Sequence, residues 1–191
     1  MMNLDPAVAA AEDLLGEHGA SEVAHPGGTL LEHLHRVRDL LSAWGASPEV
    51  QLAGLCHACY GTDGFDVALL ELAERPLLAN AIGEEAEALV YLYASCDRAS
   101  VYPQLDQGAV EFRDRFTGAS TRPDQGALRA FMDITAANEL DVVRNNSDLA
   151  AEYGPALQRL FHRASRHLAP AAADAWSGRA GPTNEQAAAS R

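Results

Sequence analysis

Apolar residues recur with the period of an α-helix along nearly the whole chain, and no stretch alternates cleanly as a half-buried strand does. Prolines and glycines separate the periodic segments and mark their ends. We therefore predict an all-α fold, a single-domain helical bundle of about seven to nine helices. The segments expected to be helical are 6–18, 29–44, 48–60, 65–74, 84–99, 107–116, 124–145 and 153–168.

The length of 191 residues fits one domain that can bury a core of its own. Residues 1–170 are assigned to this domain. Beyond them the chain is rich in alanine, glycine and serine, and no large apolar residue follows Trp176. Such a segment buries too little apolar surface to offset the entropy of ordering, so we predict a flexible C-terminal tail over residues 171–191.

The charge balance excludes several classes of function. The chain has 27 acidic and 14 basic residues, a formal net charge of -13, and all its basic residues are arginines. An acidic surface repels phosphate backbones, so no nucleic-acid partner is expected, and the lack of lysine excludes Schiff-base and P-loop lysines. No apolar run reaches membrane-span length, no signal peptide is recognisable, and three cysteines are too few for a disulfide scaffold. We expect a cytoplasmic protein with no membrane partner.

Two histidines stand out in the first half of the chain. His33 lies in the middle of the apolar stripe of segment 29–44, whereas His35 points to the other side. His57 lies near the end of segment 48–60, which is apolar on nearly all sides and is therefore expected to run through the core. We predict that His33 is buried and His35 exposed.

Polar residues in three further segments are candidates for the same pocket. In segment 124–145, Asn138 and Glu139 fall on the apolar face, where a polar group needs a partner, whereas Asp133 and Asp141 fall away from it. Asp97 directly precedes Arg98, and its carboxylate could orient a histidine or an arginine elsewhere. His25 lies in a glycine-rich loop and is a candidate for the pocket mouth. These candidates are His25, Asp97, Arg98, Asn138 and Glu139.

Three stretches of the sequence resemble the HD-domain superfamily of metal-dependent hydrolases. His33-Leu-His-Arg-Val37 is similar to the helix that carries the first histidine of that family, and 52–57 is similar to the segment that ends in its His-Asp doublet. Residues 137–141 resemble the late helix that carries its final metal-binding aspartate. The resemblance covers residues 25 to 145 and implies an HD-domain-like fold.

The sequence departs from that family at two ligand positions. Ala58 stands where the doublet has its aspartate, and Asn138 stands where the family has its last aspartate. No histidine lies between His57 and His162, so the extra ligands of dinuclear members are missing. The sequence is most similar to a divergent branch that lacks the doublet aspartate. The motifs shared with that branch are His25-Pro-Gly-Gly-Thr-Leu30, Tyr60-Gly-Thr62 and Cys96-Asp-Arg98.

These departures leave the metal content open. The resemblance implies His33 and His57 as metal ligands, but the matched positions supply two imidazoles and one neutral amide instead of two imidazoles and two carboxylates. Hard divalent ions favour anionic oxygen ligands, so the loss of two negative charges should weaken binding strongly. Either one divalent metal (Fe, Mn or Zn) is bound with help from His25, Asp97 or Glu139, or no metal is bound.

Three functions are compatible with the sequence. The first is a small HD-domain-like enzyme that acts on a small-molecule substrate, with a metal activating water for hydrolysis or dioxygen for iron-dependent oxidation. The second is a metal-independent isomerase, cyclase or lyase in which His57 or His33 is the general base, oriented by Asp97. The third is a non-catalytic ligand-binding HD-like domain. A homodimer remains open, and all three functions require the rings of His33 and His57 to meet at one cavity.

Overall fold

The computed structural model describes residues 6–65 and 67–178, and within them the chain is helical apart from loops and two short hairpins. The predicted all-α, single-domain fold is confirmed. The helices are α1 (Pro6–Glu17), α2 (Leu30–Ala43), α3 (Pro48–Leu55), α4 (Arg75–Ile82), α5 (Glu84–Ser95), α6 (Arg98–Val101), α7 (Gln125–Asn145), α8 (Ser147–Arg163) and α9 (Pro170–Ser177). The antiparallel strand pairs are β1 (Ala24–His25) with β2 (Gly28–Thr29), and β3 (Phe112–Arg113) with β4 (Ser120–Thr121).

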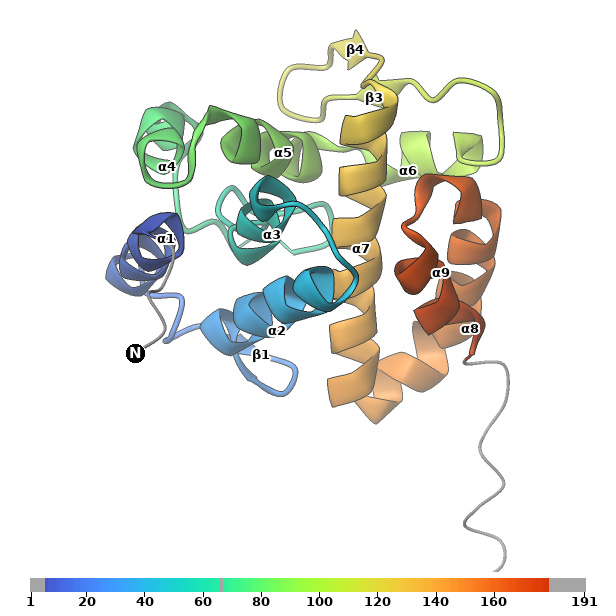
Figure 1. Ribbon diagram of the computed structural model, residues 1–191, viewed down its shortest axis with the longest axis horizontal. Helices are drawn as coiled ribbons and strands as arrows, with labels where there is room; N and C mark the ends of the chain where they lie inside the picture. The colour runs from blue at the N-terminus through green and yellow to red at the C-terminus, as the bar shows by residue number, and fades with distance from the viewer. Residues whose placement is uncertain (1–5, 66, 179–191) are drawn as a thin grey trace, which may run out of the picture.

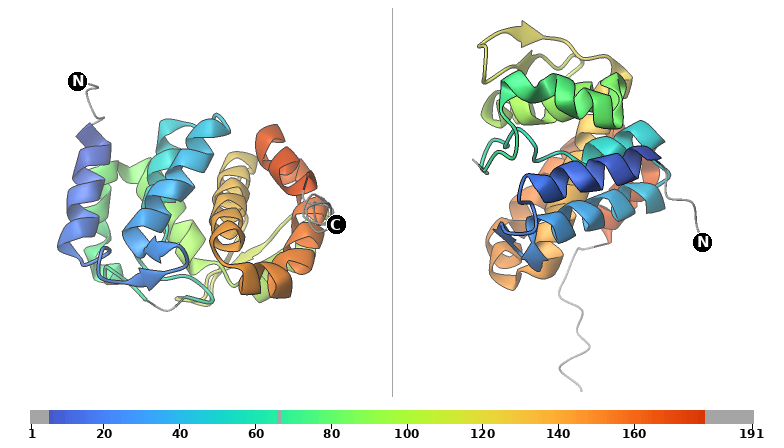
Figure 2. Two further views of the ribbon diagram at one scale, coloured as in Figure 1. Left: turned by 90° about the horizontal axis from the view of Figure 1, so that it is seen from below. Right: turned by 90° about the vertical axis from the view of Figure 1, so that its left-hand side faces the viewer.

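The long helix α7 is the centre of the molecule. It begins at Asp124, whose Oδ1 accepts a hydrogen bond from the Ala127 amide at 2.8 Å. α7 lies between α2, α3 and α5 on one side and α8 and α9 on the other (Figure 1). Seen from below, α1, α2, α7 and α8 follow one another across the molecule (Figure 2). Because α7 is covered on two sides, most of its residues are buried, including Phe131 and Met132.

Local sequence signals explain where α2 and α3 begin. Thr29 and Glu32 form a capping box at the start of α2, with the Thr29 amide donating to Glu32 Oε2 at 2.8 Å. Ser47 caps α3, and Pro48 occupies its first turn, where a missing N–H costs nothing. α3 ends at Leu55 instead of near residue 60, and the buried turn that follows carries His57.

Two predicted helices are wrong. Of the described residues in segment 65–74, only Leu72–Glu74 form a helical turn, and the α-helix is α4, which has Pro76 in its first turn. Segment 107–116 is not helical either, because it pairs with the chain beside it: the Arg113 carbonyl accepts from the Asp97 amide at 3.0 Å, and the Arg115 amide donates to the Ser95 carbonyl at 2.8 Å. These contacts between distant segments override the local periodicity.

The C-terminal boundary predicted at residue 170 is also misplaced. Residues 170–177 form α9, which Trp176 anchors: its ring lies 4.4 Å from that of Phe161 (centroid to centroid), and its Nε1 donates to the Ala136 carbonyl at 3.1 Å. One buried aromatic side chain therefore orders an otherwise small-residue segment. The remainder of the predicted tail, 179–191, lies outside the described residues.

α8 also differs from its prediction, because it begins at Ser147 and not near residue 153. Asn146 caps it, with Oδ1 accepting from the amides of Asp148 and Leu149, and Pro155 lies within the helix without ending it. Among the described residues, no helix combines the length and the apolar character needed to cross a lipid bilayer.

Candidate functional site

A pocket of about 410 Å³ lies where α2, the turn after α3, α6 and α7 meet. This volume is in the range of pockets that hold small molecules. The β1–β2 hairpin and the loop Thr62–Phe65 complete its wall. Except for Asp97, every predicted site residue lines this pocket. Those residues are His25, His33, His57, Arg98, Asn138 and Glu139.

Three histidine rings lie side by side in the pocket wall. The ring of His33 stacks on that of His25 with 3.9 Å between centroids, and it meets the edge of His57 at 5.3 Å. His57 in turn contacts the Tyr93 ring at 5.2 Å. The two imidazoles from consecutive helical segments therefore reach one cavity, which is the geometry that all three functional hypotheses require.

His33 is held in place by an ion-pair network. Its Nδ1 lies 2.7 Å from Asp141 Oδ2, and the same carboxylate receives two hydrogen bonds from Arg36, from Nε at 2.7 Å and from Nη2 at 3.0 Å. His33 Nε2 lies 3.0 Å from Asn138 Oδ1, while the Asn138 amide nitrogen donates to Glu139. Both ring nitrogens of His33 thus face oxygen atoms that can accept a hydrogen bond.

Asp141 is the site residue that the sequence analysis misplaced. It was expected to point away from the apolar face of its helix, but it is only 3% exposed and pairs with His33 and Arg36. The reason is that α7 is covered on two sides, so a residue off one apolar stripe is still buried. Asp133 was misplaced for the same reason, and burial raises its pKa to about 6. The spacings Asn138 to Asp141 and His33 to Arg36 place each pair on one helix face, a signal that could have identified the network.

His57 and His25 differ from His33 in having no carboxylate partner. His57 Nδ1 donates to the Gly54 carbonyl at 2.7 Å, which leaves a lone pair on Nε2. Burial, together with the charge of His33, lowers the pKa of His57 to about 3 and that of His25 to about 4. Both rings are therefore neutral near pH 7. The buried Nδ1 of His25 has no hydrogen-bond partner among the described residues.

Asp97 does not lie in the pocket and does not orient a histidine. Its side chain caps α6, with Oδ1 accepting from the Ser100 amide at 3.1 Å. This role follows from its position directly before a helix, where an aspartate satisfies free amide groups. The cap directs the next residue, Arg98, into the pocket.

Arg98 and Glu139 bring opposite charges to the pocket wall. The Arg98 guanidinium donates from Nε to the Tyr102 hydroxyl at 3.1 Å and from Nη1 to the Asp63 carbonyl at 3.3 Å. Burial raises the pKa of Glu139, although the positive charge of Arg98 opposes this effect. Glu139 is therefore a carboxylate of increased basicity beside a fixed cation.

The loop Thr62–Phe65 lines the pocket, although its residues were not among the predicted site residues. Thr62 and Phe65 exchange backbone hydrogen bonds at 2.8 and 3.0 Å, and the tight turn needs Gly64 with φ +97°. Asp63 Oδ2 accepts from the Arg98 amide at 3.0 Å, and the Phe65 ring meets that of His25 at 5.8 Å. The loop is thus fastened to two pocket residues.

The donor set does not fit the metal site that the HD resemblance implied. His33 Nδ1 is paired with Asp141, and its Nε2 is directed at the neutral amide oxygen of Asn138 where the family has a carboxylate ligand. Ala58 supplies no ligand atom. In the described residues, no group of three or more histidine, cysteine, aspartate or glutamate side chains is placed to hold a metal ion.

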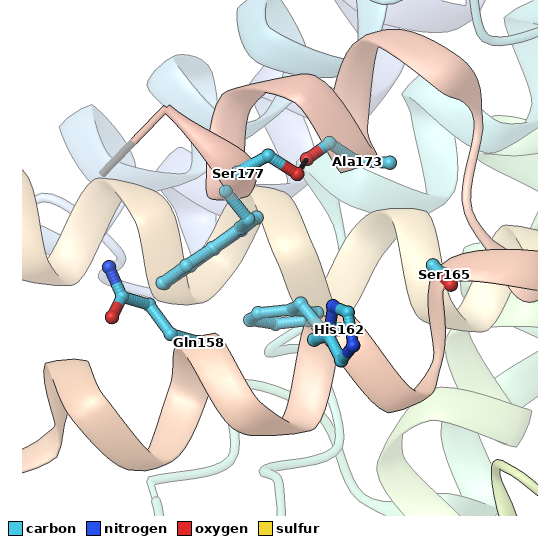
Figure 3. A pocket seen from close by; sticks show the side chains of 7 residues that line it. Gln158, His162, Ser165, Ala173 and Ser177 are labelled. Atoms are coloured by element: carbon cyan, nitrogen blue, oxygen red, sulfur yellow. Dashed lines mark hydrogen bonds between the residues drawn. The ribbon is translucent and has the colours of Figure 1, made fainter. Parts of the chain in front are cut away.

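A second, smaller pocket of about 190 Å³ lies between α8 and α9. Figure 3 shows Gln158 and His162 on one side and Ala173 and Ser177 on the other, with Ser177 Oγ donating to the Ala173 carbonyl at 2.9 Å. The Phe161 and Trp176 rings contribute to its wall. None of the predicted site residues lies there.

A family model described as a domain of unknown function (DUF6817) matches residues 14–98. The match covers less than half of the chain. It includes His25, His33, His57 and Arg98, but it stops before α7 and so omits Glu139. No curated protein and no solved structure matches the chain.

Proposed function

We propose that the chain is a small-molecule enzyme that works by metal-independent acid–base catalysis, of the isomerase, cyclase or lyase type. The observation that carries this proposal is the pairing of a basic and an acidic group in one pocket. Glu139 is a partly buried carboxylate with a raised pKa, and His33 is an imidazole that Asp141 holds with Nε2 toward Asn138. A base whose pKa is raised toward the working pH is more effective in proton transfer.

In this mechanism Glu139 removes a proton from a substrate carbon next to a carbonyl group. The electron pair of the broken C–H bond moves onto the carbonyl oxygen, and His33 Nε2 donates a proton to that oxygen once the substrate displaces Asn138. Return of a proton to a different carbon completes an isomerisation, whereas loss of a leaving group from the next carbon completes an elimination. His57 Nε2, with its free lone pair, accepts a hydrogen bond from the substrate.

A relationship to the HD-domain superfamily is part of this proposal. It is supported by the placement of the matched residues, because His33, His57 and Asn138 all line one pocket. In this interpretation Ala58 and Asn138 have replaced two carboxylate ligands, and the positive charge of a metal has been replaced by the protonated His33 and Arg98. Metal-dependent hydrolysis or oxidation and simple ligand binding are the alternatives that the experiment must separate.

The test is proton exchange with solvent. Small ketones, aldehydes and oxo acids are incubated with the protein in D₂O, and loss of C–H signals is followed by NMR. We expect exchange that survives dialysis against EDTA and that falls by roughly 10²-fold or more in Glu139→Gln. Glu85→Gln, at an exposed position of α5, is the matched control.

Two outcomes would contradict the proposal. Exchange or turnover that appears only after addition of Fe, Mn or Zn would favour the metal-dependent enzyme. Exchange that is absent with every compound, although some of them bind in the pocket, would favour a ligand-binding domain.

A further inference from the structure

Arg98 differs from two other partly buried arginines in its lack of a carboxylate partner. Arg36 is held by two hydrogen bonds to Asp141, and Arg75 by two hydrogen bonds to Glu87 at 2.7 and 2.8 Å. Within 6–65 and 67–178, Arg98 forms no ion pair. Its guanidinium contacts are a hydroxyl, a backbone carbonyl and the face of the Tyr93 ring at 4.8 Å.

This arrangement leaves a guanidinium at the pocket wall that forms no direct ion pair, although the Glu139 carboxylate lies in the same pocket. Removing a charge from water is costly unless an opposite charge compensates it. The planar guanidinium presents its N–H donors in the geometry of a carboxylate group. The geometry of Arg98 indicates a ligand that supplies oxygen acceptors.

The charges around Arg98 favour a single negative charge on that ligand. Asp141 already pairs with His33, and Glu139 and Asp63 bring two carboxylates to the same pocket. A phosphate group with two negative charges would therefore face the Arg98 cation and two nearby anions. A monocarboxylate pairs with Arg98 and adds only one negative charge.

Several apolar side chains also line the pocket and limit the size of the ligand. Leu30, Phe65, Val142 and Leu149 line the pocket, whose volume is about 410 Å³. Apolar walls around a few polar anchors are typical of pockets that bind small metabolites. The body of the ligand is therefore compact and apolar, such as a branched aliphatic chain or a single aromatic ring.

We propose that this pocket binds a small monocarboxylate whose carboxylate group pairs with Arg98. The proposal rests on the proposed function for the fate of the ligand, but the binding itself requires no turnover. Arg98 then fixes one end of the substrate, while Glu139 and His33 act on the carbons beside its polar group.

Binding of defined probes tests this proposal. Benzoate and 3-methylbutanoate are titrated against the full chain by calorimetry and NMR, with benzamide, 3-methylbutanamide and inorganic phosphate as comparisons. We expect each carboxylate to bind at least about ten-fold more tightly than its amide, because the charge-assisted pair is lost in the amide. Arg98→Lys should weaken carboxylate binding to a similar extent, whereas Arg113→Gln, at an exposed position of β3, should not change it.

A second variant keeps the test decisive if replacement of Arg98 disturbs the fold. Leu149→Trp fills the pocket from α8 without altering Arg98 and should abolish carboxylate binding. Equal affinity for carboxylates and amides, or tighter binding of phosphate, would overturn the inference. Carboxylate binding that persists without proton exchange would overturn only the proposed function, and exchange of neutral ketones without carboxylate binding would overturn only this inference.

Discussion

At the scale of single residues, Asp141 decides how His33 faces the pocket. Its carboxylate lies between the imidazole and the Arg36 guanidinium, at 2.7 Å from each. Burial acts to raise the pKa of Asp141, but the hydrogen bonds from His33 and Arg36 outweigh it and hold the pKa below its ordinary value. The same bonds fix the ring, so that Nε2 points toward Asn138 and the pocket.

Asp141→Asn should lower the free energy of unfolding by about 3 kcal/mol, because it leaves His33 and Arg36 without their anion. Since the pKa of Asp141 is lowered on folding, its contribution is complete above the ordinary value of 3.8 and is lost as the pH falls through the folded-state pKa. The difference from wild type should therefore shrink in acid. Urea unfolding at pH 7 and pH 3 measures both effects, with Asp39→Asn, an exposed position of α2, as control.

The contribution of Glu139 to folding stability should depend on pH in the opposite direction to that of Asp141, because burial raises the pKa of Glu139. Ionisation of this carboxyl costs folding stability as the pH rises above 4.5, so Glu139→Gln should melt at a higher temperature than wild type at pH 7. The same variant should lose proton exchange, and the exchange rate of the wild type should rise with pH through a midpoint above 4.5. Calorimetry and the D₂O assay measure the two changes. A Glu139→Gln variant that is less stable and fully active would contradict the assigned role.

At the scale of elements, the close contact of α2 and α3 brings His33 and His57 together. Gly54 on α3 faces Leu41 and Val37 of α2, and a methyl group added at Gly54 would collide with the Leu41 side chain. Leu41 is fully buried, so the added methyl group would force its side chain to shift among packed neighbours. The glycine therefore sets the distance between α2, which carries His33, and α3, which leads into the turn that carries His57.

Gly54→Ala should destabilise the protein by about 1–3 kcal/mol, because the added methyl group overpacks the contact of the two helices. It should also weaken the exchange activity, since separation of α2 and α3 moves His33 away from His57. Gly16→Ala on α1 is the matched control: nothing lies within 4 Å of the added methyl group, so the better helix propensity of alanine should stabilise by about 0.5–1 kcal/mol. Thermal unfolding of both variants checks the contrast, and equal effects would contradict it.

At the scale of the whole molecule, stability against acid depends on two sets of buried or partly buried titratable groups, whose pKa shifts change the free energy of unfolding in opposite directions. The neutral His25 and His57 favour the folded state above pH 6.5, and this contribution is lost as the pH falls toward their folded-state pKa values of about 4 and about 3. Asp133 and Glu139 act in the opposite direction, because their raised pKa values favour the folded state in acid. The free energy of unfolding therefore changes less with pH than the two histidines alone would predict.

His57→Gln separates these contributions. As the pH falls from 6.5 to 4, the free energy of unfolding of the wild type should decrease by roughly 1 kcal/mol per pH unit relative to this variant. The reason is that His57 binds a proton in the unfolded state but stays neutral in the folded state. Urea midpoints at half-unit steps of pH measure the difference. His35→Gln, which alters a partly exposed ring paired with Glu12, is the control, and a parallel pH dependence of the wild type and His57→Gln would contradict the explanation.

The sequence by itself determined the class of fold, the starts of α2, α3 and α7, and the choice of His33 and His57. These features are local: a cap residue, a proline in the first turn or a 3.6-residue period acts within a few residues along the chain. Candidate pocket residues on separate helices could be named for the same reason, because each lies on a recognisable face of its own segment.

Only the tertiary structure decided the partners of those residues. Asp141 reaches His33 across more than one hundred residues, and Trp176 orders α9 against Phe161. Neither contact can be predicted from the periodicity of one segment, because each depends on which helices cover which faces of α7. A helix covered on two sides buries polar residues that its own apolar stripe would place in solvent, and their pairing there gives the pocket its charges.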